Sequence, residues 1–432
     1  MSRSAAIHNG GHSRGLLVRL FSFAVLDQAL LSAANFGVGL LLIRYSTDLQ
    51  YGYYVMAFAA VLLAGTVQNA VLSGPMAVLA PKLALAAQQN LIERLHELLA
   101  RAALPLGAMV AAVFLLLGAM KLIDWSLAWV GCATGAASAA VIEREYLRRV
   151  LLVRSMPDRL LQIDFVFVVL QLLVVVLAVT QLLEHAALVS ITGIGVAAFL
   201  SSTLSRQYAR SRPAVAVAVG ARSQAFVRAW RLGKWGLLGA VMTWMHNQGF
   251  YYLLAALLSV EAVALIAAVR LLLMPINLLI TGVSQQLLPV AARWLAESGL
   301  RTLLRRGGLI AVGLLLLSVT YVAMLWWPRE WIMVHVFRRQ VIGMDPLLLL
   351  WAATFCVMAV RHAATVMLQA MELHRALVWA AAVSALCSLL SGFVGIHQFG
   401  AMGGLLGLVV GESVYLLVNL GLMWRGLRLS ER

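Results

Sequence analysis

Charged residues are scarce in this 432-residue sequence: Asp, Glu, Lys and Arg together make up 12% of it, against 62% hydrophobic residues. With a mean hydropathy of +0.92, this balance excludes a soluble globular domain and indicates a polytopic helical membrane protein. Acidic residues are the scarcest charged class, at 17 against 33 basic residues. In a membrane protein that excess is a topology signal, because Lys and Arg accumulate in cytoplasmic loops, so we expect no nucleic-acid partner.

Cysteine is almost absent as well. Cys132, Cys356 and Cys387 all lie in apolar segments, which argues against a disulfide framework and against a metal site. The sequence also lacks a glycine-rich phosphate-binding loop, an HExxH motif and any cysteine pair at metal-ligand spacing. We therefore expect no enzyme, no cofactor and no direct use of ATP.

Twelve long apolar runs predict an all-α fold of about twelve transmembrane helices, since about 20 mostly apolar residues cross a bilayer. The runs are 20–43, 53–79, 102–122, 125–147, 160–183, 187–208, 235–258, 261–287, 308–327, 347–370, 376–396 and 402–424. A basic cytoplasmic linker at 209–233 divides them into two six-helix lobes, 1–208 and 234–432. This linker is either a solvated segment held near anionic lipid or a docking site for a partner.

The basic residues predict the orientation of the helices. If the N-terminus is cytoplasmic, 26 of the 33 Lys and Arg residues fall in cytoplasmic segments and five fall on the opposite side. The remaining two, Arg270 and Arg361, lie inside apolar runs. Because Lys and Arg favour the cytoplasmic side, we expect both termini to be cytoplasmic.

The first apolar run carries a polar face. On a helix, Asp27, Gln28, Ser32, Asn35 and Gly39 fall within about 140° of one another. A carboxylate at membrane depth costs about 2.5–3.5 kcal/mol, so this face is predicted to point into a protein interior or a water-filled cavity.

Polar residues at helical spacing mark several other runs, in particular Arg270 with Asn277 and Arg361 with Gln369. The candidate substrate-binding residues are Gln28, Asn35, Arg44, Gln68, Asn69, Asn247, Arg270, Asn277, Arg361 and Gln369. The candidate coupling or ion-pairing residues are Asp27, Asp164 and Glu412. The competing interpretation of the amides and hydroxyls is hydrogen bonding between helices, worth about 0.6–2 kcal/mol each.

The arginines also allow two interpretations. A fixed cation inside a membrane either pairs with a carboxylate or faces a cavity, and for Arg270 and Arg361 both alternatives are open. Arg44, at the outer end of the first run, either lines the cavity or extends to the interface.

Residues 22–83 contain five distinctive segments: Asp27-Gln28, Ser32-Ala33-Ala34-Asn35-Phe36, Tyr51-Gly52-x-Tyr54, Gln68-Asn69-Ala70 and Ser73-x-Pro75. Together they resemble the opening of bacterial polysaccharide-biosynthesis membrane proteins, the O-antigen translocases of the Wzx type. These belong to the multidrug/oligosaccharidyl-lipid/polysaccharide (MOP) exporter superfamily. The close resemblance covers about the first two spans; the rest agrees in span number, linker and two-halves plan.

The resemblance implies two six-helix lobes in a V that open alternately to each side of the bacterial inner membrane. It also implies flipping of undecaprenyl-diphosphate-linked oligosaccharide for surface polysaccharide. The partners would be that lipid-linked oligosaccharide, membrane lipids and other polysaccharide-assembly membrane proteins. Arg270 and Arg361 match no family motif; we assign them to the diphosphate because guanidinium binds phosphate oxygens bidentately. Asp27 or Asp164 could carry a coupling proton or sodium ion.

Two other functions remain alternatives. A cation-coupled multidrug exporter of the same superfamily would use acidic residues deep in its cavity and few buried arginines. A membrane glycan polymerase or acyltransferase would need catalytic residues on the outer connection 328–346. The candidates there are Arg329, Glu330, His335, Arg338, Arg339 and Asp345.

Overall fold

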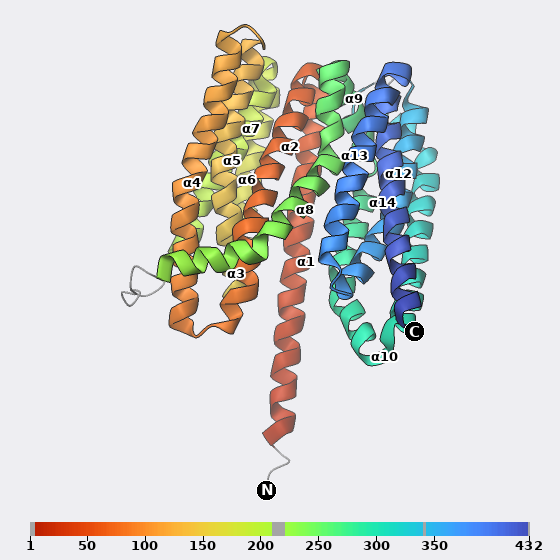
Figure 1. Ribbon diagram of the computed structural model, residues 1–432. Helices are drawn as coiled ribbons and strands as arrows, with labels where there is room; N and C mark the ends of the chain where they lie inside the picture. The colour runs from red at the N-terminus through yellow and green to blue at the C-terminus, as the bar shows by residue number, and fades with distance from the viewer. Residues whose placement is uncertain (1–4, 210–220, 340–342, 431–432) are drawn as a thin grey trace. The chain divides into compact units, whose positions relative to one another are not determined.

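The computed structural model describes residues 5–209, 221–339 and 343–430 (Figure 1). In these ranges every regular element is a helix and none is a strand, as the apolar runs predict. Within the described ranges ten helices are long and apolar enough to cross a membrane, which makes the chain a multi-pass membrane protein. The α-helices are α1 (Ala5–Tyr45), α2 (Asp48–Gln68), α3 (Gly74–Leu79), α4 (Leu85–Ala119), α5 (Trp125–Val153), α6 (Pro157–Gln181), α7 (Ala186–Ala209), α8 (Ala221–Leu257), α9 (Val260–Leu271), α10 (Met274–Trp326), α11 (Arg329–Trp331), α12 (Met344–Ala370), α13 (His374–Phe399) and α14 (Ala401–Ser430).

The helices depart from the twelve predicted spans in the middle of the chain. The predicted span 261–287 is divided between α9 and the start of α10, and α10 continues through the predicted span 308–327. Within α10, Gly299 has a φ of 75°, a left-handed conformation that glycine adopts without steric cost and that kinks the helix. The predicted span 235–258 lies in α8, which is not among the ten; polar residues 246–248 interrupt its apolar run.

The predicted linker is partly helical. Residues 210–220 lie outside the described residues, whereas 221–233 form the first part of α8 and run into the next predicted span without a break. The lobe limits at residues 208 and 234 stay a prediction.

The chain divides into two compact units. The first unit comprises Met1–Val38, Gln68–Leu182 and Leu188–Gly233, and the second comprises Gly39–Val67, Leu183–Ala187 and Lys234–Arg432. Helices α1 and α8 each contribute to both units. In the second unit α2 packs with helices from the C-terminal part of the chain, because the Trp244 indole donates to the Ala59 carbonyl at 2.8 Å.

Glycines allow close helix contacts in both units. A Cβ added to Gly135 of α5 would lie 2.4 Å from the carbonyl oxygen of Gly107 in α4. A Cβ added to Gly407 of α14 would lie 2.4 Å from the Cα of Gly392 in α13. Such contacts are typical of membrane helices, whose association depends on close packing because lipid removes the hydrophobic driving force.

Candidate functional site

Arg270 lies beside a break in the chain, in the second unit. Helix α9 ends one residue after it, and α10 begins after a gap of two residues. Pro275 accounts for the break, because it has no N–H to bond to Leu271 and its ring would clash with that carbonyl. The Tyr321 hydroxyl donates to the neighbouring Leu272 carbonyl at 2.9 Å. The predicted continuous span 261–287 is therefore wrong: it is a discontinuous helix, a form that transporters use at binding sites.

The Arg270 guanidinium has neighbours but no counter-ion among the described residues. Its Nη1 donates to the Tyr251 hydroxyl at 3.1 Å, and its central carbon lies 5.3 Å from the centre of the Trp351 ring. Its Nε is buried without a hydrogen-bond partner. Across the described residues Arg270 forms no salt bridge with a carboxylate. A buried N–H without an acceptor is costly, and a bound anion would relieve that cost.

Three predicted amides of the second unit keep unused hydrogen-bonding groups. Asn247, Asn277 and Gln369 are half-buried, and their side chains make no hydrogen bond with the described residues. The Thr281 hydroxyl donates to the backbone carbonyl of Asn277 at 2.8 Å, so this bond does not use the side-chain amide of Asn277. These side chains remain available to a polar ligand.

Arg361 pairs with a carboxylate, one of the two alternatives that its sequence position allows. Its Nε lies 2.5 Å from Glu412 Oε2, and both side chains are buried. His246 Nε2 lies 2.9 Å from Glu412 Oε1, and Ser384 Oγ lies 2.9 Å from His246 Nδ1. The ring of Tyr415 flanks the guanidinium at 4.7 Å. We call His246, Arg361, Ser384 and Glu412 the Glu412 network.

The first unit buries a second charge cluster, which we call the Asp164 cluster: Asp27, Arg144, Glu145, Arg148 and Asp164. Asp164 is fully buried and accepts hydrogen bonds from Arg144 and from Arg148 Nε, the latter at 2.8 Å. Arg148 Nη2 also donates to Asp27 Oδ2 at 2.7 Å, while Glu145 accepts from both arginines. Asp27 Oδ1 is buried without a partner. Three carboxylates therefore share two guanidinium groups.

The amides predicted in the first unit differ in their contacts. Gln68 donates to the Ser73 hydroxyl at 2.7 Å across a π-helical turn at Asn69–Ser73. Asn69 accepts from Arg149 Nη2 at 3.3 Å, and Asn35 is exposed. These contacts fit a structural role for Gln68 and leave Asn35 and the Asn69 amide nitrogen as candidates.

Gln28 and Arg44 also bond to protein groups. Gln28 donates to the Ser32 hydroxyl at 3.4 Å, one helical turn away. Arg44 Nη1 donates to the Val336 carbonyl at 3.1 Å, and its guanidinium lies 5.4 Å from the centre of the Tyr45 ring. In the second unit Arg44 thus links the C-terminal end of α1 to residues beyond α11.

The arginines of the Asp164 cluster are the functional candidates that the sequence did not reveal. The fourth apolar run predicts a span that ends at residue 147, which would place Arg148 and Arg149 in a cytoplasmic connection. Helix α5 instead continues to Val153, and Arg148 bonds to the buried carboxylates of Asp27 and Asp164. The signal was the Glu145-x-x-Arg148 spacing, which puts opposite charges on one helix face, near predicted spans whose carboxylates needed counter-ions.

The described fold resembles those of solved membrane transporters. No protein family and no curated protein matches the sequence. Among solved structures, an inward-facing multidrug resistance MATE family transporter of the MOP superfamily is similar at a TM-score of 0.73 and 12% identity. The similarity covers 94% of this chain and 95% of that transporter. At such identity it establishes the fold class, an all-helical MATE-like architecture.

Two further structures show the range of proteins that share this fold. The lipid II flippase MurJ in an inward closed conformation has a TM-score of 0.69 at 9% identity, over 93% of this chain and 87% of that chain. A MOP superfamily transporter from Pyrococcus furiosus has a TM-score of 0.65 at 13% identity, over 96% of this chain and 95% of that chain. The fold thus occurs both in multidrug transporters and in a lipid flippase.

Proposed function

We propose that this chain flips an undecaprenyl-diphosphate-linked oligosaccharide across the bacterial inner membrane for surface polysaccharide synthesis, with both termini cytoplasmic. The observation that carries the proposal is Arg270, which lies beside a broken helix with a buried unsatisfied N–H and has no counter-ion in the described ranges. A guanidinium suits a diphosphate because its planar N–H groups match phosphate oxygens in pairs.

The chemistry of the cargo explains why such a site is needed. A sugar–diphosphate headgroup cannot cross hydrocarbon bare, since each unsatisfied polar group costs several kcal/mol. Arg270 would hold the diphosphate, and the free amides of Asn247, Asn277 and Gln369 would replace water around the sugars. An inside-negative potential favours outward movement of each negative charge by about 2.3 kcal/mol per 100 mV.

The carboxylates bear on energy coupling. Glu412 and Asp164 are engaged by arginines, but the Asp164 cluster retains one more carboxylate than guanidinium groups. The unpartnered Oδ1 of Asp27 is where we propose that a coupling proton or sodium ion binds. In the Glu412 network, Arg361 binds Glu412 through Nε and Nη2. Its Nη1 would contact the cargo.

A multidrug exporter is the second candidate, because MATE family transporters share the fold. It is less well supported, since a cationic drug would meet the unpaired charge of Arg270. The polymerase or acyltransferase alternative has weaker support still. Three candidate residues of the outer connection have structural partners: Arg329 and Asp345 pair with each other at 2.7 Å, and Arg339 donates to the Ile43 carbonyl at 2.9 Å.

The test is transfer of a fluorescent undecaprenyl-diphosphate oligosaccharide between leaflets of vesicles containing the purified chain. Losing a hydrogen bond to a charged group costs about 1.5–3 kcal/mol, so Arg270→Ala should slow transfer roughly 10- to 100-fold. Arg270→Lys should keep the charge and restore part of the rate. Arg306→Gln is the matched control, because Arg306 also lies over an indole ring, that of Trp294, but is exposed.

Equal transfer by the wild type and Arg270→Ala would remove Arg270 from the mechanism. Transport of a lipophilic cation by the wild type, without glycolipid transfer, would establish the exporter instead.

A further inference from the structure

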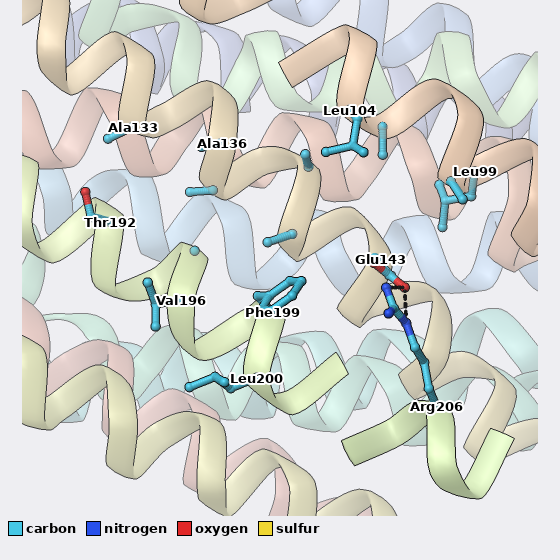
Figure 2. Close-up of a pocket in the computed structure, with 16 residues that line it drawn as sticks. Leu99, Leu104, Ala133, Ala136, Glu143, Thr192, Val196, Phe199, Leu200 and Arg206 are labelled. Atoms are coloured by element: carbon cyan, nitrogen blue, oxygen red, sulfur yellow. Dashed lines mark hydrogen bonds and ion pairs between the residues drawn. The ribbon is translucent and has the colours of Figure 1, made fainter. Parts of the chain in front are cut away.

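A pocket of about 440 Å³ lies in the first unit, between α4, α5 and α7 (Figure 2). Its walls are small or apolar side chains, except for Thr192 at one end and the Glu143–Arg206 pair at the other. All three helices are membrane spans by length and composition. Phe199 and Leu104, on its wall, are 52% and 72% exposed. Large apolar groups exposed on a membrane span face hydrocarbon, so a lipid chain can enter this pocket.

The pocket is about one leaflet deep. Along α5 it extends from Ala133 to Glu143, ten residues at about 1.5 Å each, or about 15 Å. This is half of the about 30 Å hydrocarbon core. Its ionic end lies at the predicted cytoplasmic end of α7. One acyl chain of a cytoplasmic-leaflet lipid fits that depth, whereas the much longer undecaprenyl chain would extend beyond it.

The ionic end offers a cation to a lipid headgroup. Glu143 Oε1 accepts from Nε and Nη2 of Arg206 at 2.8 and 2.6 Å, which leaves Nη1 without a partner in the described part of the chain. The Arg206 side chain is 39% exposed. Two residues further along α7, Arg159 stacks on the Tyr208 ring at 4.9 Å, and Arg154 donates to the Tyr208 carbonyl at 3.3 Å. The phosphate ligand at the pocket is therefore Arg206, while Arg154 and Arg159 add positive charge at the same end of α7, which favours an anionic headgroup.

We propose that the α4–α5–α7 pocket binds an anionic phospholipid of the cytoplasmic leaflet, with one acyl chain along the apolar walls and the phosphate at Arg206. The site is separate from Arg270 and does not depend on what the chain transports.

Native mass spectrometry of the full-length chain tests the proposal. The protein is purified in a mixture of phosphatidylglycerol and phosphatidylcholine with identical acyl chains, and retained lipids are counted. The wild type should retain phosphatidylglycerol in preference to phosphatidylcholine. Ala136→Phe should lower phosphatidylglycerol retention at least about tenfold by filling the pocket from an exposed wall position. Arg206→Gln should abolish the preference between headgroups while the pocket still takes a chain.

The matched control is Ala102→Phe, which adds the same ring at an exposed position of α4 that does not line the pocket. Its lipid retention should equal that of the wild type. Ala140→Leu fills the same pocket with a smaller group and provides a second test if Ala136→Phe impairs folding. Equal retention of both lipids by the wild type, or unchanged phosphatidylglycerol in the pocket-filling variants, would overturn the proposal. So would displacement of phosphatidylglycerol by added undecaprenyl phosphate, which would assign the pocket to the cargo.

Discussion

Breaking the Glu412 network separates a structural role of Arg361 from a role in transport. Glu412→Leu removes the carboxylate that both Arg361 and His246 contact. Arg361→Met removes the guanidinium but leaves His246 as a partner for the carboxylate. The double variant Arg361→Met/Glu412→Leu removes both charges and keeps similar side-chain volume, so it measures how far each group depends on the other.

The expected magnitudes follow from burial. The two side chains are 6% and 1% exposed, so water screens the pair very little. Removing one partner of a buried ion pair costs about 3–5 kcal/mol in the free energy of unfolding. Glu412→Leu should fall at the upper end, because a guanidinium and an imidazole both lose their acceptor, and Arg361→Met at the lower end. The double variant should cost less than about 2 kcal/mol, since an apolar pair of similar volume is often neutral.

The assay is equilibrium unfolding of each purified variant in mixed micelles with increasing dodecyl sulfate, followed by helical circular dichroism. Single costs of about 5 and 3 kcal/mol and a double cost below about 2 kcal/mol imply a coupling free energy of at least about 6 kcal/mol. This exceeds the range of about 0.5–3 kcal/mol that is usual for residues in contact, as expected for a buried ion pair. Single-variant costs that add to within about 0.5 kcal/mol in the double variant would refute the ion pair. If the double variant is stable, its transfer rate decides the second question: a wild-type rate would exclude contact between Arg361 and the cargo.

Two further predictions concern stability. Asp164→Asn should lower the free energy of unfolding by about 3–5 kcal/mol and Asp27→Asn by about 1–3 kcal/mol. The order follows because Asp164 is fully buried between two arginines, whereas Asp27 bonds to one. Equal losses of unfolding free energy in the two variants would contradict it. Gly407→Leu should prevent stable packing of α13 on α14, whereas the matched Gly313→Leu, with nothing within 4 Å of its added Cβ, should change stability by less than about 0.5 kcal/mol. Thermal aggregation of the two variants compares them directly, and a fully stable Gly407→Leu would show that the helix pair can separate there.

Apolar runs predicted the helices well because lipid leaves the backbone few alternatives: in hydrocarbon, every N–H and C=O must bond within the chain. The same runs could not predict where a helix ends when its last turns contain buried charged residues. Arg148 shows why, because a guanidinium held by Asp27 and Asp164 no longer counts as a group that must stay in water. Hydropathy assigns each residue type a fixed free-energy cost of leaving water, whereas the actual cost for a charged residue depends on the partner that it binds.

The break beside Arg270 was within reach of the sequence. Pro275 lies inside the predicted span 261–287, and a proline there removes one backbone hydrogen bond and clashes with the preceding turn. What the sequence could not supply is the group that compensates for the break, Tyr321, which lies 49 residues from the Leu272 carbonyl to which it donates. Partners so far apart in the chain meet only through the tertiary fold, so neither periodicity nor spacing reveals them.

The distribution of partners in the second unit gives Arg270 its significance. The carboxylate of Glu412 is already used by Arg361 and His246, so it cannot neutralise a second cation without leaving the first one stranded. Arg270 pairs with no other carboxylate that the structure describes, so its charge costs about 2.5–3.5 kcal/mol if it lies at membrane depth. An anion that binds there recovers this free energy, and by linkage it must also stabilise the folded chain. Inorganic diphosphate should thus raise the unfolding midpoint of the wild type more than that of Arg270→Ala, a difference that an Arg270 with a protein counter-ion would not produce.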